Sequence, residues 1–454
     1  MKPTICFGAI VKNESKIIKR LFDSIKEFID YWVIIDTGST DNTVEILESF
    51  KQEIPGEIHH STWNNFQDNR NELLEKTLDK SKYTLLMDAD MILKKVNENF
   101  TKKDLIDYLE KNFKNPCFSI KQVNPLLNWW NNRIINRSKN VWIYSVVTHE
   151  TLVVLKSEYP PEEWSDQKLD QFLWISDIGD GGSKTKKLER DIRLLTEAIP
   201  KETNSYKIFH MLFYLGQSYI NLASSSEQTN DYVPDDRLSF RNMAVRLYNN
   251  AIELAKTYPV DEEELWCCKW FLGGAMHAVG FSLRQVQNQY LSAFNHRPYR
   301  MEPMYDLMFL CLSNNDIHSA YHFGKMCLEP FNDQSKKFNL KLLSAKQDNL
   351  FIRRDYREVL FWFYFGLVCE HLGLAYLTFA CALELKKANQ TSELYKLKQK
   401  ELEEWIKKVS EKLLEAIKLE SQKQIEQQKP QEEAKNQIIT TKYQKFIPKD
   451  LTIK

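Results

Sequence analysis

The chain has 454 residues and equal numbers of basic and acidic side chains, 62 Lys and Arg against 62 Asp and Glu. A formal net charge of zero argues against a nucleic-acid binder, because such proteins attract the phosphate backbone with an excess of positive charge. The length allows two or three domains of roughly 150 residues each. We therefore expect a multidomain protein that has no nucleic-acid partner.

The eight cysteines have no C-x-x-C spacing, which indicates small buried side chains of a reducing compartment rather than disulfides or a zinc site. The apolar run at residues 5–11 is too short for a signal peptide. No stretch approaches the roughly 20 apolar residues of a membrane helix. These features predict a soluble, cytoplasmic protein without a membrane span.

The first ninety residues alternate short apolar runs with amphipathic segments. The runs at residues 5–11, 32–35 and 83–87 are typical of buried strands, and residues 16–29 and 66–78 have the apolar spacing of helices. This alternation is typical of βαβ units and a parallel sheet. The pattern therefore predicts an α/β domain whose ligands gather at the carboxyl ends of the strands.

Two aspartates, Asp88 and Asp90, directly follow the third of these strands. Carboxylates beside a buried strand are costly unless a cation neutralises them, and hard oxygen ligands suit Mg²⁺ or Mn²⁺. A surface turn with two solvated aspartates is the alternative for this stretch alone. Asn13, Asp36 and Arg70 are expected at the same edge of the sheet, and this convergence favours a functional site.

Further polar segments follow the aspartates. Residues 128–133, NWWNNR, form an aromatic and amide cluster between strands expected at 118–123 and 141–147. Such residues bind sugars and phosphates, although a Trp-rich corner of the core explains the tryptophans equally well. After the second strand, His149 can complete a metal site or donate to a phosphate, and Glu150 can act as a general base. A satisfied polar cluster is the alternative.

Residues 179–182, Gly-Asp-Gly-Gly, follow another expected strand at 174–178. They predict a flexible segment able to close over a ligand, with an interdomain turn as the alternative. From residue 183 the chain changes to amphipathic helices, and related helix pairs recur every roughly 35 to 55 residues. Small residues such as Gly216 stand where neighbouring helices would approach. This part resembles degenerate tetratricopeptide repeats stacked into a solenoid.

These patterns divide the chain into four parts. Residues 1–182 form the α/β domain and residues 183–390 the helical-repeat domain. Residues 391–428, rich in Lys, Glu and Gln with periodic apolar positions, predict a long amphipathic helix that could present a partner surface. We expect residues 429–454 to be disordered.

Four segments, in this order and spacing, resemble the family 2 nucleotide-sugar glycosyltransferases of the GT-A fold. They are AIVKNE at 9–14, VIIDTGSTDNT at 33–43, FQDNRN at 66–71 and LLMDADM at 85–91. The resemblance covers the first 180 residues and implies a Rossmann-like GT-A domain that binds a nucleotide-sugar donor. The subgroup includes members with a helical-repeat C-terminal half, some of which glycosylate peptides, and residues 183–390 fit that organisation.

The resemblance also implies which residues contact the nucleotide. Asp36 matches the position that contacts the base or ribose, and Val11 and Glu14 line the same pocket. Arg70 matches the Arg of an Arg-Asn pair that approaches the nucleotide. Arg133, at the end of the NWWNNR cluster, is a further candidate for donor binding.

For the metal and the chemistry, the resemblance implies a second group of residues. Asp88 and Asp90 match the Asp-x-Asp that binds ribose and the metal diphosphate, Asp90 most directly. His149 and Glu150 match a Tyr-x-x-x-His-Glu segment on the acceptor side, and His149 is the candidate third metal ligand. The family often uses an acidic residue of a Glu-Asp motif as the catalytic base, and this chain lacks that dipeptide in the expected region. Our candidate base is therefore Glu150, with Asp180 second.

These assignments predict a transferase that requires Mn²⁺ or Mg²⁺ and inverts the anomeric configuration of a sugar taken from a nucleoside-diphosphate donor, with uridine as the expected nucleoside. The acceptor is a peptide, protein or glycan. The helical part can also serve homo-oligomer contacts. The alternative is a non-catalytic helical-repeat scaffold with a degenerate nucleotide-binding domain. A nucleotidyltransferase is disfavoured, because no Gly-rich basic loop follows the first strand.

Overall fold

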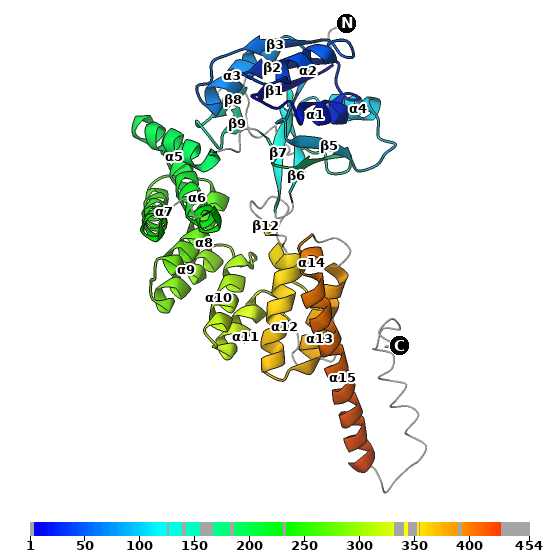
Figure 1. Cartoon of the computed structure of the whole chain (residues 1–454), viewed down its shortest axis with the longest axis vertical. Helices are drawn as coiled ribbons and strands as arrows, with labels where there is room; N and C mark the ends of the chain where they lie inside the picture. The colour runs from blue at the N-terminus through cyan, green and yellow to red at the C-terminus, as the bar shows by residue number, and fades with distance from the viewer. Residues whose placement is uncertain are drawn as a thin grey trace. The chain divides into compact units, whose positions relative to one another are not determined.

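A computed structural model describes residues 4–124, 127–138, 142–154, 167–181, 186–229, 233–330, 340–343, 352–353, 355–388 and 393–427. The chain divides into two compact units, Met1–Gln289 with Lys346–Ile352 and Tyr290–Ala345 with Arg353–Lys454 (Figure 1). The expected disorder of residues 429–454 and the expected flexibility of Gly182 lie outside the described residues. The boundaries expected at residues 182 and 390 stay predictions.

The first unit is built on a mixed sheet (Figure 1). Its first half has the order β3-β2-β1-β4 with all strands parallel. These strands are β1 (Ile5–Val11), β2 (Tyr31–Asp36), β3 (Gly56–His60) and β4 (Tyr83–Leu86). The βαβ prediction is confirmed for this half, and the carboxyl ends of the strands meet at one edge.

The second half of the sheet is mixed, in the order β7-β6-β11-β5. Its strands are β5 (Met91–Lys95), β6 (Cys117–Val123), β7 (Leu127–Asn136) and β11 (Leu173–Asp177), with the short β10 (Gln167–Lys168) beside β6. A separate antiparallel hairpin consists of β8 (Trp142–Ser145) and β9 (Thr151–Val154). The short strand β12 (Ile352–Arg353) completes the strands of the described residues.

The interpretation of residues 128–133 as a cluster between strands is wrong, because these residues form most of β7 itself. Trp130 pairs with Lys121 of β6, and Ile134 pairs with Leu85 of β4 on the other side. The segment carries mostly amide and aromatic side chains, so it lacks the alternation of apolar and polar residues that predicts a strand. Its pairing with β4 and β6 satisfies its backbone and decides its conformation.

Helices cover both faces of the sheet. The helices α1 (Ile18–Ile25), α2 (Thr43–Phe50) and α4 (Lys102–Lys111) contribute to one core, and α3 (Phe66–Thr77) contributes to the opposite core. Alternate side chains of β1 point to the two faces, so that Phe7 meets Phe22 of α1 at a ring distance of 5.7 Å, whereas Cys6 belongs to the core that contains Leu73 of α3. The strands are therefore buried on both sides, which explains their continuous apolar runs.

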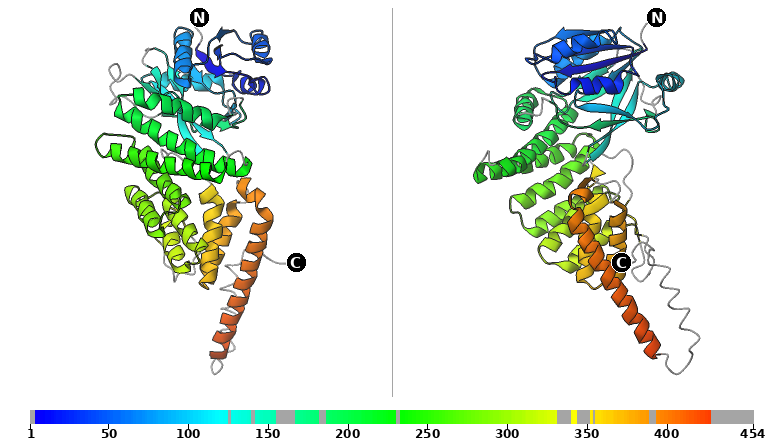
Figure 2. Two further views of the ribbon diagram at one scale, coloured as in Figure 1. Left: turned by 60° about the vertical axis from the view of Figure 1, so that its left-hand side comes forward. Right: turned by 45° about the vertical axis from the view of Figure 1, so that its right-hand side comes forward.

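The first unit continues with helices. They are α5 (Lys187–Ala198), α6 (Ser205–Thr229), α7 (Pro234–Ala255) and α8 (Glu262–Ala278), with a short 3₁₀ turn at Ile199–Lys201, and α9 (Leu283–His296) contains the division between the units. Figure 2 shows α6 and α7 lying side by side. A Cβ at Gly216 of α6 would stand 2.8 Å from the ring of Tyr248 of α7, so the expected close approach at this small residue is confirmed.

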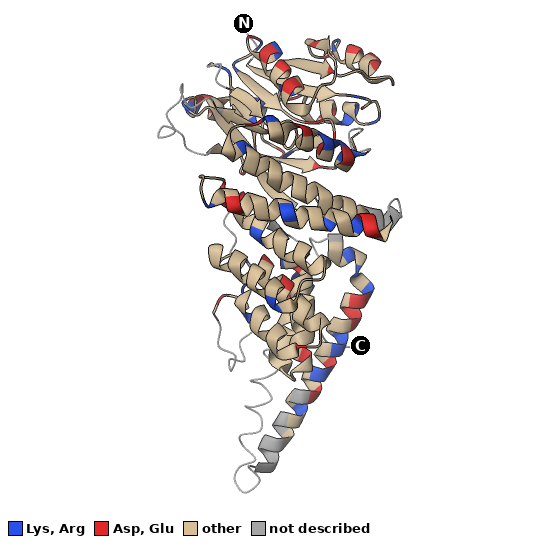
Figure 3. Cartoon of the chain, turned by 90° about the vertical axis from the view of Figure 1, so that its left-hand side faces the viewer, with Lys and Arg blue, Asp and Glu red and all other residues tan. Residues whose placement is uncertain are grey.

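The second unit is helical in its described residues apart from short strand pairings. Its helices are α10 (Glu302–Ser313), α11 (Ile317–Met326), a π-helical segment at Tyr356–Leu360, α12 (Phe361–His371), α13 (Ala375–Ala388), α14 (Glu393–Leu397) and α15 (Gln399–Gln427). The expected long helix is thus interrupted at Lys398, and Figure 3 shows basic and acidic residues interspersed along α15. Trp405 of α15 donates to the Glu370 carboxylate of α12 at 3.1 Å.

The predicted fold class, an α/β domain followed by a helical region, is confirmed by this order of elements. All eight cysteines are free thiols, and seven of them are buried. Within the described ranges, no helix combines the length and the apolar character that a bilayer crossing requires.

Candidate functional site

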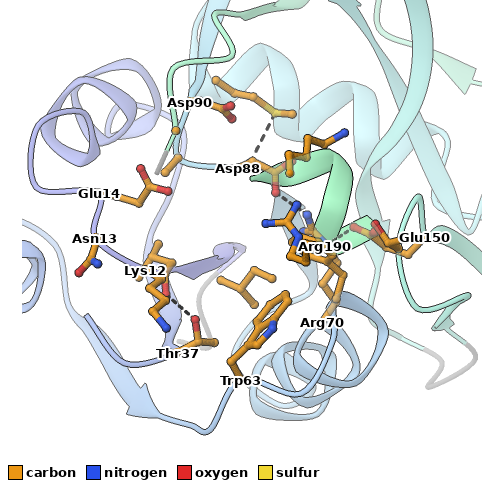
Figure 4. A pocket seen from close by; sticks show the side chains of 18 of the residues that line it. Lys12, Asn13, Glu14, Thr37, Trp63, Arg70, Asp88, Asp90, Glu150 and Arg190 are labelled. Atoms are coloured by element: carbon orange, nitrogen blue, oxygen red, sulfur yellow. Dashed lines mark hydrogen bonds and ion pairs between the residues drawn. The ribbon is translucent and has the colours of Figure 1, made fainter. Parts of the chain in front are cut away.

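A cavity of about 450 Å³ opens at the carboxyl edge of the parallel strands (Figure 4). Its walls come from the turns after β1, β2, β3 and β4, from α3, from the loop between β8 and β9, and from α5. The lining residues used below are Val11, Lys12, Asn13, Glu14, Thr37, Trp63, Phe66, Arg70, Asp88, Asp90, Thr148, His149, Glu150, Gly181, Lys187 and Arg190. Of the residues expected to form the site, Asp36, Arg133 and Asp180 do not line this cavity.

The centre of the cavity wall is an ion-pair triad around Arg70. The guanidinium of Arg70 donates from Nη2 to Asp88 Oδ1 at 2.6 Å, and its Nε forms an ion pair with Glu150. The group also lies over the ring of Tyr144, 5.4 Å from its centroid. Burial alone would lower the pKa of Arg70, but the two carboxylates outweigh it and hold the pKa well above its usual value. Arg70 therefore joins the turn after β4 to the loop that carries Glu150.

Arg133 supports this arrangement from the strand behind it. Its Nε and Nη2 donate to Gln122 Oε1 at 3.0 and 2.7 Å, and Nη2 lies 3.8 Å from Asp88 Oδ2. Because Arg133 is buried and does not line the cavity, it touches the site through Asp88. Its expected contact with the donor stays a prediction.

Asp90 and Glu14 approach each other around Gly181. A Cβ at Gly181 would stand 3.3 Å from Asp90 Oδ2 and 3.4 Å from Glu14 Oε1. Both carboxylates are only 7% exposed, so they face the cavity rather than bulk water. The absence of a side chain at Gly181 therefore leaves the space between the two carboxylates open.

Asp36 is engaged at the end of β2 and outside the cavity lining. Its carboxylate accepts the backbone N–H of Ser39 at 3.2 Å and lies 3.2 Å from Nδ1 of His60. The neighbouring Thr37 donates its N–H to the carbonyl oxygen of Val11 at 3.0 Å and does line the cavity. Asp36 thus shapes the turn that borders the cavity, and its contact with a base or ribose stays a prediction.

Asp180 is held elsewhere. Its two carboxylate oxygens accept from Arg20 of α1 at 2.8 and 2.7 Å, in a fork that engages both oxygens at once. Glu150, in contrast, lines the cavity. Of the two candidate bases, the geometry favours Glu150.

The loop between β8 and β9 carries Glu150 in a strained conformation. Val146 and His149 have φ angles of 73° and 53°, in the region that costs a non-glycine residue about 1–3 kcal/mol, most for a β-branched side chain. Thr148 donates its hydroxyl to Asp191 of α5 at 3.2 Å, and Val146 packs in the core formed with α5, α6 and α7. Contacts with these helices therefore maintain the conformation of the loop.

His149 is stacked on Tyr214 of α6, with ring centroids 4.1 Å apart. Burial, followed by the positive charges of Lys187, His210 and Arg190, holds the pKa of His149 well below its usual value. The imidazole is therefore neutral near pH 7. Its Nε2 lies 3.7 Å from Asp191 Oδ2.

The expected metal ligands are not gathered into one group. Within the part of the chain that the structure describes, no three His, Cys, Asp or Glu side chains converge closely enough to hold a metal ion. Asp88 forms an ion pair with Arg70, and Asp90 and Glu14 are acidic residues that line the cavity. Carboxylate oxygens suit Mg²⁺ or Mn²⁺, which take further ligands from water and bound phosphates. The donor set around Asp90 therefore fits the expected metal.

Several lining residues were not anticipated from the sequence. Trp63 and Phe66 face the cavity with ring centroids 4.8 Å apart, and Lys187 and Arg190 reach it from α5. The spacing of Lys187 and Arg190 places them on one face of an expected helix, which is the only local signal. Because they are far from the aspartates in sequence, the sequence alone did not indicate that they line the same cavity.

Residues 7–154 match a family model described as Glycosyl transferase family 2. The SPbeta prophage-derived glycosyltransferase SunS of Bacillus subtilis (strain 168) is 36% identical over 97 residues, which are 21% of this chain and 22% of that protein. Glycosyltransferase SunS of Bacillus phage SPbeta gives the same values. The chain thus spans about a fifth of the length of the curated relatives it matches.

Among solved structures, residues 1–349 of S. aureus TarS in complex with UDP-GlcNAc are similar with a TM-score of 0.33 and 12% identity, over 64% of this chain and 92% of that chain. MamA is similar with a TM-score of 0.28 and 16% identity, over 47% of this chain and 94% of that chain. Similarity at this level supports no inference about ligands or mechanism.

Proposed function

We propose that this chain, whose residues 7–154 carry a glycosyl transferase family 2 domain, moves a sugar from a nucleoside-diphosphate donor to a nucleophile of a peptide, protein or glycan. The observation that carries the proposal is the cavity at the carboxyl edge of the sheet, where Arg70 joins Asp88 to Glu150 beside Asp90. Its volume of about 450 Å³ lies in the range of small-molecule sites. We take the uridine form as the expected donor.

Asp90 and Glu14 are the residues we assign to a divalent metal, Mn²⁺ or Mg²⁺. Their carboxylates approach the same point at Gly181. A bound metal would supply electrostatic stabilisation of the diphosphate as its negative charge develops. The chain itself holds the two carboxylates in place: Glu14 donates its backbone N–H to Thr43 at 2.8 Å, and the Asp90 carbonyl accepts from Ile178 at 3.1 Å.

Glu150 is the proposed general base. Arg70 pairs with its carboxylate at the cavity wall, where the proposal has it accept a proton from the acceptor hydroxyl, amine or thiol. As that proton moves to Glu150, the acceptor atom forms a bond to the anomeric carbon, and the bond from that carbon to the phosphate oxygen breaks. A single displacement of this kind inverts the configuration of the anomeric carbon.

The test is donor turnover by the full chain against a panel of nucleotide sugars, with and without Mn²⁺. We expect metal-dependent release of the nucleotide from one donor, and loss of that release in Asp90→Asn at an unchanged melting temperature. Asp23→Asn on the exposed face of α1 is the matched control and should turn over normally. A folded protein that binds no donor would refute the transferase, and a product with retained configuration would refute the single displacement.

A further inference from the structure

Two cationic side chains of α5 line the same cavity as Asp88 and Asp90. Lys187 and Arg190 are three residues apart and therefore lie on one face of the helix, and both line the cavity. Figure 4 places Arg190 among the side chains that surround it. Neither residue belongs to the segment that matches the family model, which ends at residue 154.

A fully buried carboxylate holds both cations in position. Asp191, with 0% exposure, accepts from Arg190 Nε and Nη2 at 3.3 and 3.2 Å, and its other oxygen lies 3.3 Å from Lys187 Nζ. The guanidinium of Arg190 also lies 4.8 Å above the ring of Phe66. The two cationic groups are therefore arranged before any ligand binds, which reduces the entropy lost on binding.

The charge and shape of this wall suit phosphate oxygens. Arginine offers a planar fork of donors and lysine a compact positive charge, and both groups bind phosphates in proteins. The depressed pKa of the neighbouring His149 is consistent with a positive potential here, since burial and then Lys187, His210 and Arg190 disfavour its protonation. The positive charges of Lys187 and Arg190 would attract an anion that enters the cavity.

We propose that Lys187 and Arg190 form an anion subsite that binds the diphosphate of the nucleotide-sugar donor. This inference rests on the proposed function and extends it, because it makes α5 a part of the donor site. The first helix after the sheet domain then supplies positive charge to the leaving diphosphate, in addition to any metal at Asp90. Asp191 is a positioning residue, which acts through the two cations.

The test compares the binding of UDP, UMP and uridine to the full chain by calorimetry, in Mn²⁺ and in its absence. Charge-assisted hydrogen bonds to phosphate are strong, so Lys187→Gln should weaken UDP binding by about tenfold or more. Uridine binding should change by less than about twofold, because uridine has no phosphate to contact. Arg190→Gln is the second variant, and its effect on UDP should persist without metal.

The matched control is Arg193→Gln on the same helix. Arg193 is 56% exposed, pairs with Glu197 and does not line this cavity, so the substitution removes the same charge at a different place. It should leave UDP binding unchanged. Melting temperatures identify a variant that fails to fold, and Lys187, at 39% exposure, is the safer position.

Unchanged UDP affinity in both folded variants, when the wild-type chain binds UDP, would overturn the subsite and leave the proposed function intact. A drop in affinity of the same size for uridine and UDP would also overturn it, because the effect would then lie outside the phosphates. Absence of binding of any nucleotide by the wild-type chain would overturn the proposed function together with the subsite.

Discussion

The imidazole of His210 donates a hydrogen bond from Nε2 to the backbone carbonyl oxygen of His149 across 2.9 Å. The other ring nitrogen of His210 lies 2.8 Å from Glu264 of α8, and both side chains are buried. His149 is a strained residue that directly precedes Glu150. Two helices that follow the sheet domain thus hold the loop that presents the proposed base.

Replacing His210 by Ala should disturb this loop. The substitution leaves the His149 carbonyl and the buried Glu264 without their partner, which costs about 1–3 kcal/mol of unfolding free energy for each buried group. Donor turnover should fall by at least about tenfold, because Glu150 loses its fixed position. Urea denaturation and donor turnover measure the two effects. His277→Ala, at an exposed position of α8, should change neither, and full turnover in His210→Ala would contradict the positioning role.

The two histidines should give opposite slopes of stability against pH. The pKa of His149 is lowered, first by burial, so the unfolded chain binds more protons and stability falls as the pH drops below the ordinary value of 6.5. Burial lowers the pKa of His210, but Glu264 outweighs it and raises the pKa, so its contribution is lost as the pH rises above 6.5. Denaturation of wild type, His149→Asn and His210→Gln at pH 5.5, 6.5 and 8 tests this. His149→Asn should reduce only the loss of stability below pH 6.5, and His210→Gln should reduce only the loss above pH 6.5.

Arg70→Lys should be poorly tolerated although it keeps the charge. A lysine offers one ammonium where Arg70 spans Asp88 and Glu150 with two different nitrogens. We expect a loss of about 3 kcal/mol in unfolding free energy, since one carboxylate loses its partner at the cavity wall. Donor turnover should fall to background. Chemical denaturation and turnover are the measurements, and a variant as active as wild type would refute the triad.

Gly181→Ala tests the space between Asp90 and Glu14. The new methyl group would stand 3.3 and 3.4 Å from their carboxylate oxygens, so the fold is retained but the gap is narrowed. We expect an unchanged melting temperature and a weaker response of donor turnover to Mn²⁺, by about tenfold in the half-saturating concentration, if one ligand of the metal is displaced. An unaltered Mn²⁺ titration would argue against a metal at this place.

In the second unit, Glu302→Ala should destabilise a buried ion pair. Arg300 and Glu302 have 0% exposed side chains, and Arg300 Nε lies 3.1 Å from a Glu302 oxygen. Removing the carboxylate leaves a buried guanidinium without this partner, which costs about 3–5 kcal/mol. Fluorescence-detected unfolding should show a shifted transition. Glu302→Gln, which keeps an oxygen acceptor, should recover part of the loss.

Local pattern was enough to predict the first half of the sheet and the helical character of the second half of the chain. The apolar runs of β1, β2 and β4 and the spacing of α3 follow from burial on both sides of a parallel sheet. The polar residues at the strand ends therefore had a predictable edge in common. Of the residues predicted at this edge, Asn13, Arg70, Asp88 and Asp90 line one cavity, and Asp36 does not. Val11 and Glu14, which the family resemblance indicated, line it as well.

The tertiary structure decided what depends on partners distant in sequence. The amide-rich strand β7 forms because β4 and β6 flank it, and a pattern without regular apolar spacing carries no such information. Likewise, the sequence offered both Asp180 and Glu150 as the candidate base. The structure separates them, because Asp180 pairs with Arg20 outside the cavity lining, whereas Glu150 pairs with Arg70 and lines the cavity. The position of α5 at the cavity also depended on the tertiary structure. The sequence specifies each helix through its own residues, whereas the site is assembled from elements that are far apart in the chain.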